Sequence, residues 1–227
     1  MVAAVLAGVA SLLLSLPAHG QAPKRPVLAT GDSMIQYVDV ALERRLQRRV
    51  VSDAQIATGI SKPLPLDWPR YAVEQVDRHK QGATVMFVGA NDGFDMRTPE
   101  GTRVRCCARP WRIEYARRAS AMMAAYAREG AAKVYWLTLP QAREGFFREV
   151  YPAVNAGLRR ASREHRDDVR LIRLNDVFTP RGRYRETMRW KGRTVVVRQD
   201  DGIHLSPAGA DIAATLVEDA LRADGLR

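Results

Sequence analysis

Ser33, which lies just beyond a short apolar run, is a residue that could act as a nucleophile. Residues Val27 to Thr30 favour a strand, and Gly31-Asp32-Ser33 favours a tight turn. The spacing of the apolar residues after Ser33 predicts a helix. A serine at the start of a helix exposes its hydroxyl, and a neighbouring neutral imidazole can take the proton from that hydroxyl. Ser33 could also be an N-cap, which serine favours, so its partners in the sequence decide between the two interpretations.

The partners come from a second polar cluster, Asp201-Gly202-Ile203-His204, which precedes the last predicted helix. The three-residue offset lets a carboxylate accept a hydrogen bond from the imidazole within one tight turn. The imidazole can then take the serine proton, while the carboxylate fixes its tautomer and stabilises the imidazolium. Asp200 competes for this role, but only Asp201 has the offset. The sequence therefore predicts Ser33 as nucleophile, His204 as proton relay and Asp201 as the orienting carboxylate.

Two further polar clusters, Thr58-Gly59 and Gly89-Ala90-Asn91-Asp92, each follow a predicted strand. A tetrahedral oxyanion needs hydrogen-bond donors where its charge develops. The backbone amides of Ser33 and Gly59 and the side-chain amide of Asn91 are the candidates, and a glycine lets the backbone approach a ligand closely. A plain loop glycine and a plain turn asparagine are the alternative interpretations.

The elements that must position these clusters alternate between strands and helices. Strands are predicted to begin at residues 27 and 50 and to span residues 83–88, 133–138 and 169–174, and helices to follow Ser33, to start near Asp67, and to span residues 111–129, 146–164 and 207–223. This alternation predicts an α/β fold with a parallel sheet, helices on both faces and functional loops beyond the carboxyl ends of the strands.

Two long connections interrupt the alternation, residues 93–110 and a hairpin-like segment at 181–198. Connections of this length are often functional, so we expect both to shape the substrate cleft. Arg198, at the end of the second, is a candidate for binding a substrate carboxylate, or it pairs with an acidic neighbour. Trp111 and Tyr115 lie one helical turn apart, which favours core packing over sugar stacking.

The N-terminus indicates export. Residues 2–16 form an uncharged apolar run, followed by Pro17 and Ala18-His19-Gly20, which is similar to a cleavage site. We predict a signal peptide at residues 1–20, with an uncleaved anchor as the alternative, then a linker at 21–26 and one domain at 27–227. The expected location is periplasmic or secreted, in a bacterium.

Composition limits the partners and cofactors. The net charge is +11, but 31 of the 36 basic residues are arginine and they are scattered along the sequence, so we expect no nucleic-acid partner, while association with anionic envelope polymers stays open. Cys106 and Cys107, the only cysteines, are either two small buried side chains or a local bridge between neighbours. No zinc-like spacing occurs, and we predict no metal and no cofactor.

The four clusters, in this order, resemble conserved blocks of the SGNH (GDSL-like) hydrolases. Gly31-Asp32-Ser33-Met34 is similar to block I, Gly59 to block II, Gly89 to Asp92 to block III, and Asp201 to His204 to block V. Longer strings, such as RQDDGIHLSP at residues 198–207, resemble a branch of stand-alone, exported bacterial members. The resemblance implies a three-layer α/β/α, flavodoxin-like fold with a central five-stranded parallel sheet, and ester chemistry.

Together these expectations describe an exported serine esterase that removes short acyl groups, O-acetyl first, from a carbohydrate or cell-envelope polymer through an acyl-serine intermediate. An acylated polysaccharide or another small ester is the expected substrate. Two alternatives stay open. One is an O-acyltransferase in which a sugar hydroxyl resolves the acyl-enzyme, and the other is a non-catalytic glycan-binding module that keeps the fold.

Overall fold

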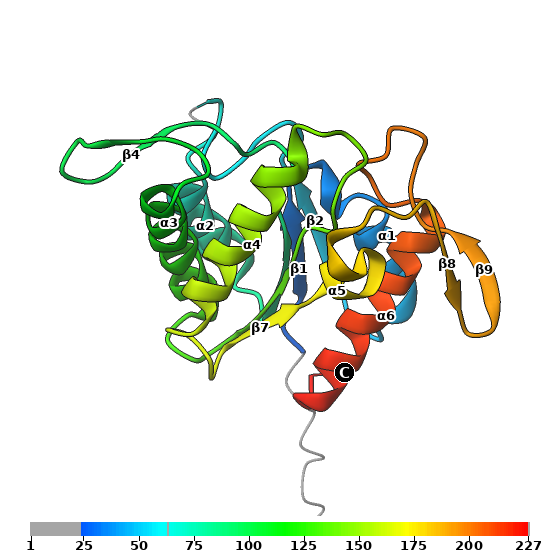
Figure 1. Ribbon diagram of the computed structural model, residues 1–227. Helices are drawn as coiled ribbons and strands as arrows, with labels where there is room; N and C mark the ends of the chain where they lie inside the picture. The colour runs from blue at the N-terminus through cyan, green and yellow to red at the C-terminus, as the bar shows by residue number, and fades with distance from the viewer. Residues whose placement is uncertain (1–23, 63, 227) are drawn as a thin grey trace, which may run out of the picture.

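A five-stranded parallel sheet forms the centre of the molecule in the computed structural model, which describes residues 24–62 and 64–226 (Figure 1). The predicted leader, residues 1–20, and residues 21–23 of the predicted linker lie outside the described residues. The order of the strands is β2-β1-β3-β6-β7. Their bounds are β1 Val27–Gly31, β2 Val50–Ala54, β3 Ala83–Phe87, β6 Lys133–Leu137 and β7 Val169–Ile172.

Helices cover both faces of this sheet. On one side α3 packs between α2 and α4, and on the other α1 packs against α6 (Figure 1). Their bounds are α1 Val38–Arg45, α2 Trp68–His79, α3 Arg109–Ala127, α4 Phe147–Ser162 and α6 Pro207–Ala223, with the short α5 at Leu174–Phe178. The predicted three-layer α/β/α fold with a five-stranded parallel sheet is confirmed.

The two central strands carry the loops that matter most for the site. β1 and β3 are buried along their whole length, as expected for strands covered on both faces. Their register pairs Gly31 with Phe87, so the polar residues after the two strands start at the same level. A Cβ on Gly31 would lie 2.0 Å from the carbonyl oxygen of Phe87, and its φ of +149° disfavours a side chain as well.

Local signals place most element boundaries, with two corrections. Asp67 caps α2 through its side chain, which accepts from the backbone N–H of Arg70, as the sequence predicted. The helix expected after Ser33 is split instead into a 3-10 turn, η1 (Ser33–Ile35), and α1, because Tyr37 adopts a φ of +62° between them. The strand expected to reach residue 174 ends at Ile172, and Leu174 begins α5.

The two long connections contain short antiparallel hairpins. β4 (Met96–Arg97) pairs with β5 (Arg103–Val104), and β8 (Thr187–Trp190) with β9 (Arg193–Val196), after the 3-10 turn η2 at Pro180–Gly182. The hairpin predicted within residues 181–198 is thus confirmed. Cys106 and Cys107 are joined in a disulfide, which decides between the two interpretations of this pair.

Aromatic side chains fill the layer between the sheet and helices α2 to α4. Trp111 and Tyr115 are fully buried and stack with ring centroids 4.9 Å apart, so the core-packing interpretation of this pair is correct.

Among the described residues no helix is both long and apolar enough to cross a bilayer.

We expect the Gly157→Ala substitution in α4 to destabilise the fold. A Cβ there would lie 2.7 Å from Cδ1 of Tyr115, whose ring is held by Trp111 and by a hydrogen bond from its hydroxyl to Asp92. Overpacking costs about 1–3 kcal/mol and the helix-propensity gain is about 1 kcal/mol, so the free energy of unfolding should fall by up to about 2 kcal/mol. Urea unfolding measures the change.

Gly145→Ala is the matched control, because a Cβ at Gly145 meets nothing within 4 Å. Its free energy of unfolding should stay within about 0.5 kcal/mol of the wild type. Equal stability of the two variants would show that α3 and α4 can move apart without loss.

Candidate active site

Ser33 lies just beyond the carboxyl end of β1, where the chain turns into η1. Its hydroxyl oxygen lies 2.7 Å from Nε2 of His204, a residue 171 positions later in the sequence. Ser33 is half-buried, and its hydroxyl faces a cavity rather than the core. Its N-cap role falls to Asp32, whose side chain accepts from the backbone N–H of Met34.

The imidazole of His204 is held on its other side by Asp201. Nδ1 of His204 lies 2.5 Å from Oδ2 of Asp201, while Oδ1 of Asp201 accepts the backbone N–H groups of Ile203 and His204 at 2.8 and 3.0 Å. Partial burial acts to raise the pKa of Asp201, but these hydrogen bonds outweigh it and leave the pKa below its ordinary value. The carboxylate is therefore an acceptor, and Nε2 is left to accept the proton of Ser33.

Asp200, the competing carboxylate, takes no part in this contact. It is exposed, and its backbone carbonyl accepts a hydrogen bond from the guanidinium of Arg143. Of the two neighbouring carboxylates, the structure brings only Asp201 to His204.

Arg198 does not lie in the cleft. Its side chain is 1% exposed, with Nη1 donating to the carbonyl of Ile203 at 2.7 Å and Nη2 to that of Gln141 at 2.8 Å. Burial lowers the pKa of this guanidinium to about 10. The structure therefore corrects the substrate-binding role suggested by the sequence, because Arg198 fastens the loop that carries His204 to the loop after β6.

Asn91, a predicted oxyanion donor, lies at the cavity beside Ser33. Its side-chain amide donates to the carbonyl of Thr58 at 3.0 Å and lies 3.5 Å from Oδ2 of Asp32. These contacts orient the amide at the junction of the loops after β1, β2 and β3. The structure thus brings Asn91 together with Ser33 and His204.

Gly59 lies behind this junction and does not line the cavity. A Cβ at Gly59 would lie 2.6 Å from Oδ1 of Asp92, so the absence of a side chain lets the two loops meet. The backbone N–H groups of Ser33 and Gly59 donate to no other described residue. Ser33 lines the cavity, so its N–H can reach a ligand there, whereas Gly59 is buried behind the cavity wall.

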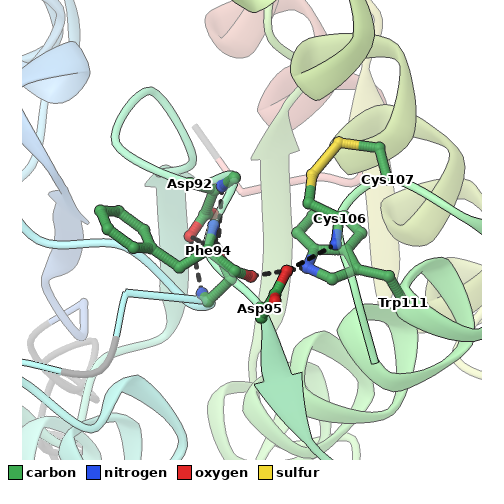
Figure 2. The surroundings of a disulfide bond; sticks show 8 residues. Asp92, Phe94, Asp95, Cys106, Cys107 and Trp111 are labelled. Carbon is green, nitrogen blue, oxygen red and sulfur yellow. Dashed lines mark hydrogen bonds between the residues drawn. A yellow bond between two sulfur atoms is a disulfide. The ribbon is translucent and has the colours of Figure 1, made fainter. Parts of the chain in front are cut away.

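Asp92 anchors the loop after β3 from below. Oδ1 of Asp92 accepts from the backbone N–H and the hydroxyl of Ser61 at 2.6 and 2.9 Å, and Oδ2 accepts from the hydroxyl of Tyr115 at 2.7 Å. Burial raises the pKa of Asp92 and raises that of Tyr115 well above its ordinary value. The chain beyond Asp92 is fastened as well, since the hydroxyl of Ser61 accepts from the N–H of Phe94. The indole of Trp111 also donates to the Phe94 carbonyl at 2.7 Å (Figure 2).

The cavity beside Ser33 has a volume of about 570 Å³. Neither long connection contributes to its wall, which corrects the expectation that both shape the cleft. The first packs instead against α3. Within this connection Asp95 accepts the backbone N–H of Cys106 (Figure 2). The lining residues are Ser33, Gln36, Tyr37, Asp39, Val40, Ile56, Ala57, Asn91, Gln199 and His204.

Residues 26–220 match the family model described as "Protein of unknown function (DUF459)". The chain belongs to this family. A comparison with curated proteins found no match.

Solved structures share the fold of this DUF459 protein at low sequence identity. Est24, a carbohydrate acetylesterase from Sinorhizobium meliloti, is 16% identical with a TM-score of 0.59, over 88% of this chain and 99% of that one. The aryl esterase of M. smegmatis is 12% identical with a TM-score of 0.57, again over 88% and 99%. The catalytic domain of peptidoglycan O-acetyltransferase A from Streptococcus pneumoniae is 16% identical with a TM-score of 0.53, over 88% and 94%. The predicted resemblance to SGNH hydrolases is confirmed for the fold.

The sequence of the DUF459 chain did not predict several residues of the cavity wall. Gln36, Tyr37 and Val40 follow Ser33 closely, and their place in the wall depends on the break between η1 and α1. A positive φ on a tyrosine has no sequence signature. Gln199 lies two residues before Asp201 in the sequence, and this closeness to the Asp201–His204 motif is the signal that could have placed it in the cavity wall.

No group of three or more histidine, cysteine or acidic side chains within the described residues could hold a metal ion. The cavity instead offers a hydroxyl, an imidazole and several amides. With Ser33, His204 and Asp201 in hydrogen-bonded series, this arrangement can activate an oxygen nucleophile against a carbonyl carbon.

A buried carboxyl group, Asp32, ties the loops after β1 and β3 together. Its Oδ1 accepts the N–H of Met34, and its Oδ2 accepts those of Gly89 and Ala90 at 2.8 and 2.9 Å. Burial raises the pKa of Asp32 from 3.8 to about 6, in spite of these hydrogen bonds. The native protein therefore holds this proton more tightly than the unfolded chain does.

We expect the stability advantage of the wild type over Asp32→Asn to shrink as the pH rises. Asp32 stabilises most below its unfolded pKa, and this contribution is lost as the pH rises through the folded value of about 6. The difference in free energy of unfolding should fall by about 2 kcal/mol between pH 4 and pH 7. Urea unfolding across this range measures it, with Asp200→Asn as the control for the loss of one surface charge. A difference that grows with pH would contradict the assigned shift.

Proposed function

We propose that this protein is an extracytoplasmic serine esterase that removes short acyl groups, O-acetyl first, from a carbohydrate or cell-envelope polymer. The observation that carries the proposal is the series Ser33, His204 and Asp201, joined by contacts of 2.7 and 2.5 Å beside an open cavity. A purely structural serine needs neither an imidazole within reach nor an oriented carboxylate behind it.

In the first half of the reaction the hydroxyl oxygen of Ser33 attacks the ester carbonyl carbon. His204 Nε2 takes the hydroxyl proton, and Asp201 stabilises the imidazolium that forms. The tetrahedral intermediate then collapses, its bond to the sugar oxygen breaks, and the imidazolium returns the proton to that oxygen. The products are a free sugar hydroxyl and an acyl group on Ser33.

In the second half water attacks the acyl-enzyme. His204 takes a proton from the water as the new carbon–oxygen bond forms, and then returns a proton to Ser33 as the carboxylic acid leaves. In both halves negative charge develops on the former carbonyl oxygen. The free N–H groups of Ser33 and Gly59 and the amide of Asn91 are the donors proposed for it.

The chemistry of the cavity wall supports a carbohydrate ester. Gln36, Gln199 and Asn91 offer amide donors and acceptors that suit sugar hydroxyls, while the exposed Tyr37 offers an aromatic surface. Est24 is described as a carbohydrate acetylesterase and the Streptococcus pneumoniae domain as a peptidoglycan O-acetyltransferase, which supports acyl transfer on a glycan as the chemistry here.

A periplasmic or secreted location is part of this proposal and rests on the apolar leader at residues 1–20. An envelope polymer as substrate requires that location, because the polymer lies outside the cytoplasm. Cleavage of the leader in a producing bacterium is read from the N-terminal sequence of the exported protein.

We expect Ser33→Ala to abolish ester hydrolysis and Asp201→Asn to lower kcat by about 10²–10⁴-fold, because the imidazole loses its orienting carboxylate. Asp200→Asn is the matched control, since Asp200 does not contact His204, and its kcat should equal that of the wild type. Steady-state hydrolysis of p-nitrophenyl acetate measures all three variants. A fluorophosphonate probe should label Asp200→Asn as fast as the wild type, Asp201→Asn more slowly, and Ser33→Ala not at all. Full activity of Ser33→Ala would overturn the mechanism.

The similarity to a peptidoglycan O-acetyltransferase domain favours an acyltransferase as the second candidate. The same acyl-Ser33 would then react with a sugar hydroxyl in place of water. We expect steady release of acetate from an acetyl ester without added glycan, because the cavity is open to water. Turnover that appears only with a glycan acceptor, followed by acetate release and by mass spectrometry of the glycan, would replace the esterase with the transferase.

A further inference from the structure

A second cavity, of about 260 Å³, lies between α3 and α4, on the face of the sheet that α2, α3 and α4 cover. It shares no residue with the cavity beside Ser33. Apart from Ile113 and Ala156 its lining is entirely basic. We call it the arginine groove, formed by Arg109, Arg112, Arg159, Arg160 and Arg163.

The fold gathers these arginines from two separate stretches of the sequence. Arg109 and Arg112 begin α3, and Arg159 to Arg163 end α4, about 50 residues later. The two helices pack side by side (Figure 1). The expectation that the arginines are scattered is therefore wrong for the surface between α3 and α4.

None of the five guanidinium groups makes an ion pair or a hydrogen bond with another described residue. Some of the other described arginines do pair with a carboxylate. Arg45 pairs with Asp211 and Glu218, and Arg118 with Glu114. Five unpaired positive charges in one groove repel each other, and an anion placed among them would relieve that repulsion.

The start of α3 adds to the positive potential. The exposed N–H groups of a first helical turn carry a partial positive charge that acidic residues usually balance. The first turn of α3 has no acidic residue, and Arg109 and Arg112 stand there instead. This placement is unfavourable for helix stability and favourable for binding an anion.

We propose that the arginine groove binds an acidic polysaccharide, through carboxylate or phosphate groups spaced along the polymer. A planar guanidinium donates two parallel hydrogen bonds to a carboxylate or phosphate group. It therefore suits a polymer with a row of such groups better than the ammonium group of a lysine, which acts as a point charge. That the ligand is a polysaccharide rests on the proposed function. That it is an anion follows from the unpaired arginines alone. A membrane surface fits less well, because Ile113 is the one large apolar side chain in the groove, and interfacial binding needs a broad apolar face.

Binding in this groove would hold the polymer to the enzyme while its acyl groups exchange at the separate cleft. Such tethering raises the effective concentration of the acyl groups without any new contact at Ser33. It should therefore lower KM for the polymer and leave the hydrolysis of a small ester unchanged.

The test uses the full chain and polygalacturonate, a carboxylated polysaccharide, with dextran as the neutral probe. The groove variant combines Arg112→Gln, Arg159→Gln and Arg160→Gln. The matched control combines Arg185→Gln, Arg189→Gln and Arg193→Gln on and beside the β8–β9 hairpin, where all three arginines are exposed. Both variants lose three positive charges. The groove variant should keep its fold because glutamine is a good helix former, and the control should keep its fold because its three arginines are exposed.

We expect the wild type and the control to bind polygalacturonate alike at low ionic strength and to ignore dextran. The groove variant should bind it at least about tenfold more weakly, because three charge contacts are lost. Titration calorimetry measures binding, and p-nitrophenyl acetate should be hydrolysed at equal rates by all three proteins. If no ester is hydrolysed but the groove variant still binds polygalacturonate more weakly than the control, the proposed esterase function is wrong and the proposed anion binding by the groove stands.

Three outcomes would overturn the groove proposal. Equal weakening in the control would show that net charge alone drives the binding. Binding to phosphatidylglycerol vesicles but not to polygalacturonate would assign the groove to a membrane. Tighter binding to double-stranded DNA than to polygalacturonate at equal salt would assign it to nucleic acid.

Discussion

The site depends on one buried carboxyl group. Asp32 has no exposed surface, and it accepts the backbone N–H groups of Met34, Gly89 and Ala90, which belong to the loops after β1 and β3. Each buried N–H left without an acceptor would cost about 1–3 kcal/mol, so these loops are stable together only with this group between them. Ser33 follows Asp32 directly and Asn91 follows Ala90. The group that stabilises the sheet edge therefore also sets the distance between the nucleophile and its neighbour.

The other half of the site comes from the far end of the chain and needs its own fastening. The loop that carries Asp201 and His204 is fastened by Arg198, whose guanidinium joins the carbonyls of Ile203 and Gln141. Only a planar group with several fixed donors can span two carbonyls in this way. Burial opposes the charge of Arg198, and the two hydrogen bonds offset part of that cost. The loop after β6 thus sets the position of His204 against Ser33.

The sequence predicts what local patterns encode, and it misses what the packing of distant segments decides. The layers, the five strands and the proximity of Ser33 and Asn91 follow from runs of apolar residues that each end in a polar cluster, because parallel strands align their carboxyl ends. The pairing of Asp201 with His204 follows from their three-residue offset. Tyr37 enters the cavity wall only because its backbone turns into a positive φ. The burial of Arg198 and the gathering of five arginines depend on segments that meet only in the folded chain.

The distribution of charge separates two kinds of recognition on this surface. The residues that line the cavity beside Ser33 include one carboxylate, Asp39, and no arginine or lysine, so a polyanion gains nothing there from basic side chains. The arginine groove has the reverse character, with five unpaired guanidinium groups and no carboxylate. An acylated sugar unit is neutral at its ester, while an acidic polymer carries its charge elsewhere along the chain. On the proposed function, the groove would then recognise the polymer by its charge and the cleft would select the ester, so neither surface need compromise for the other.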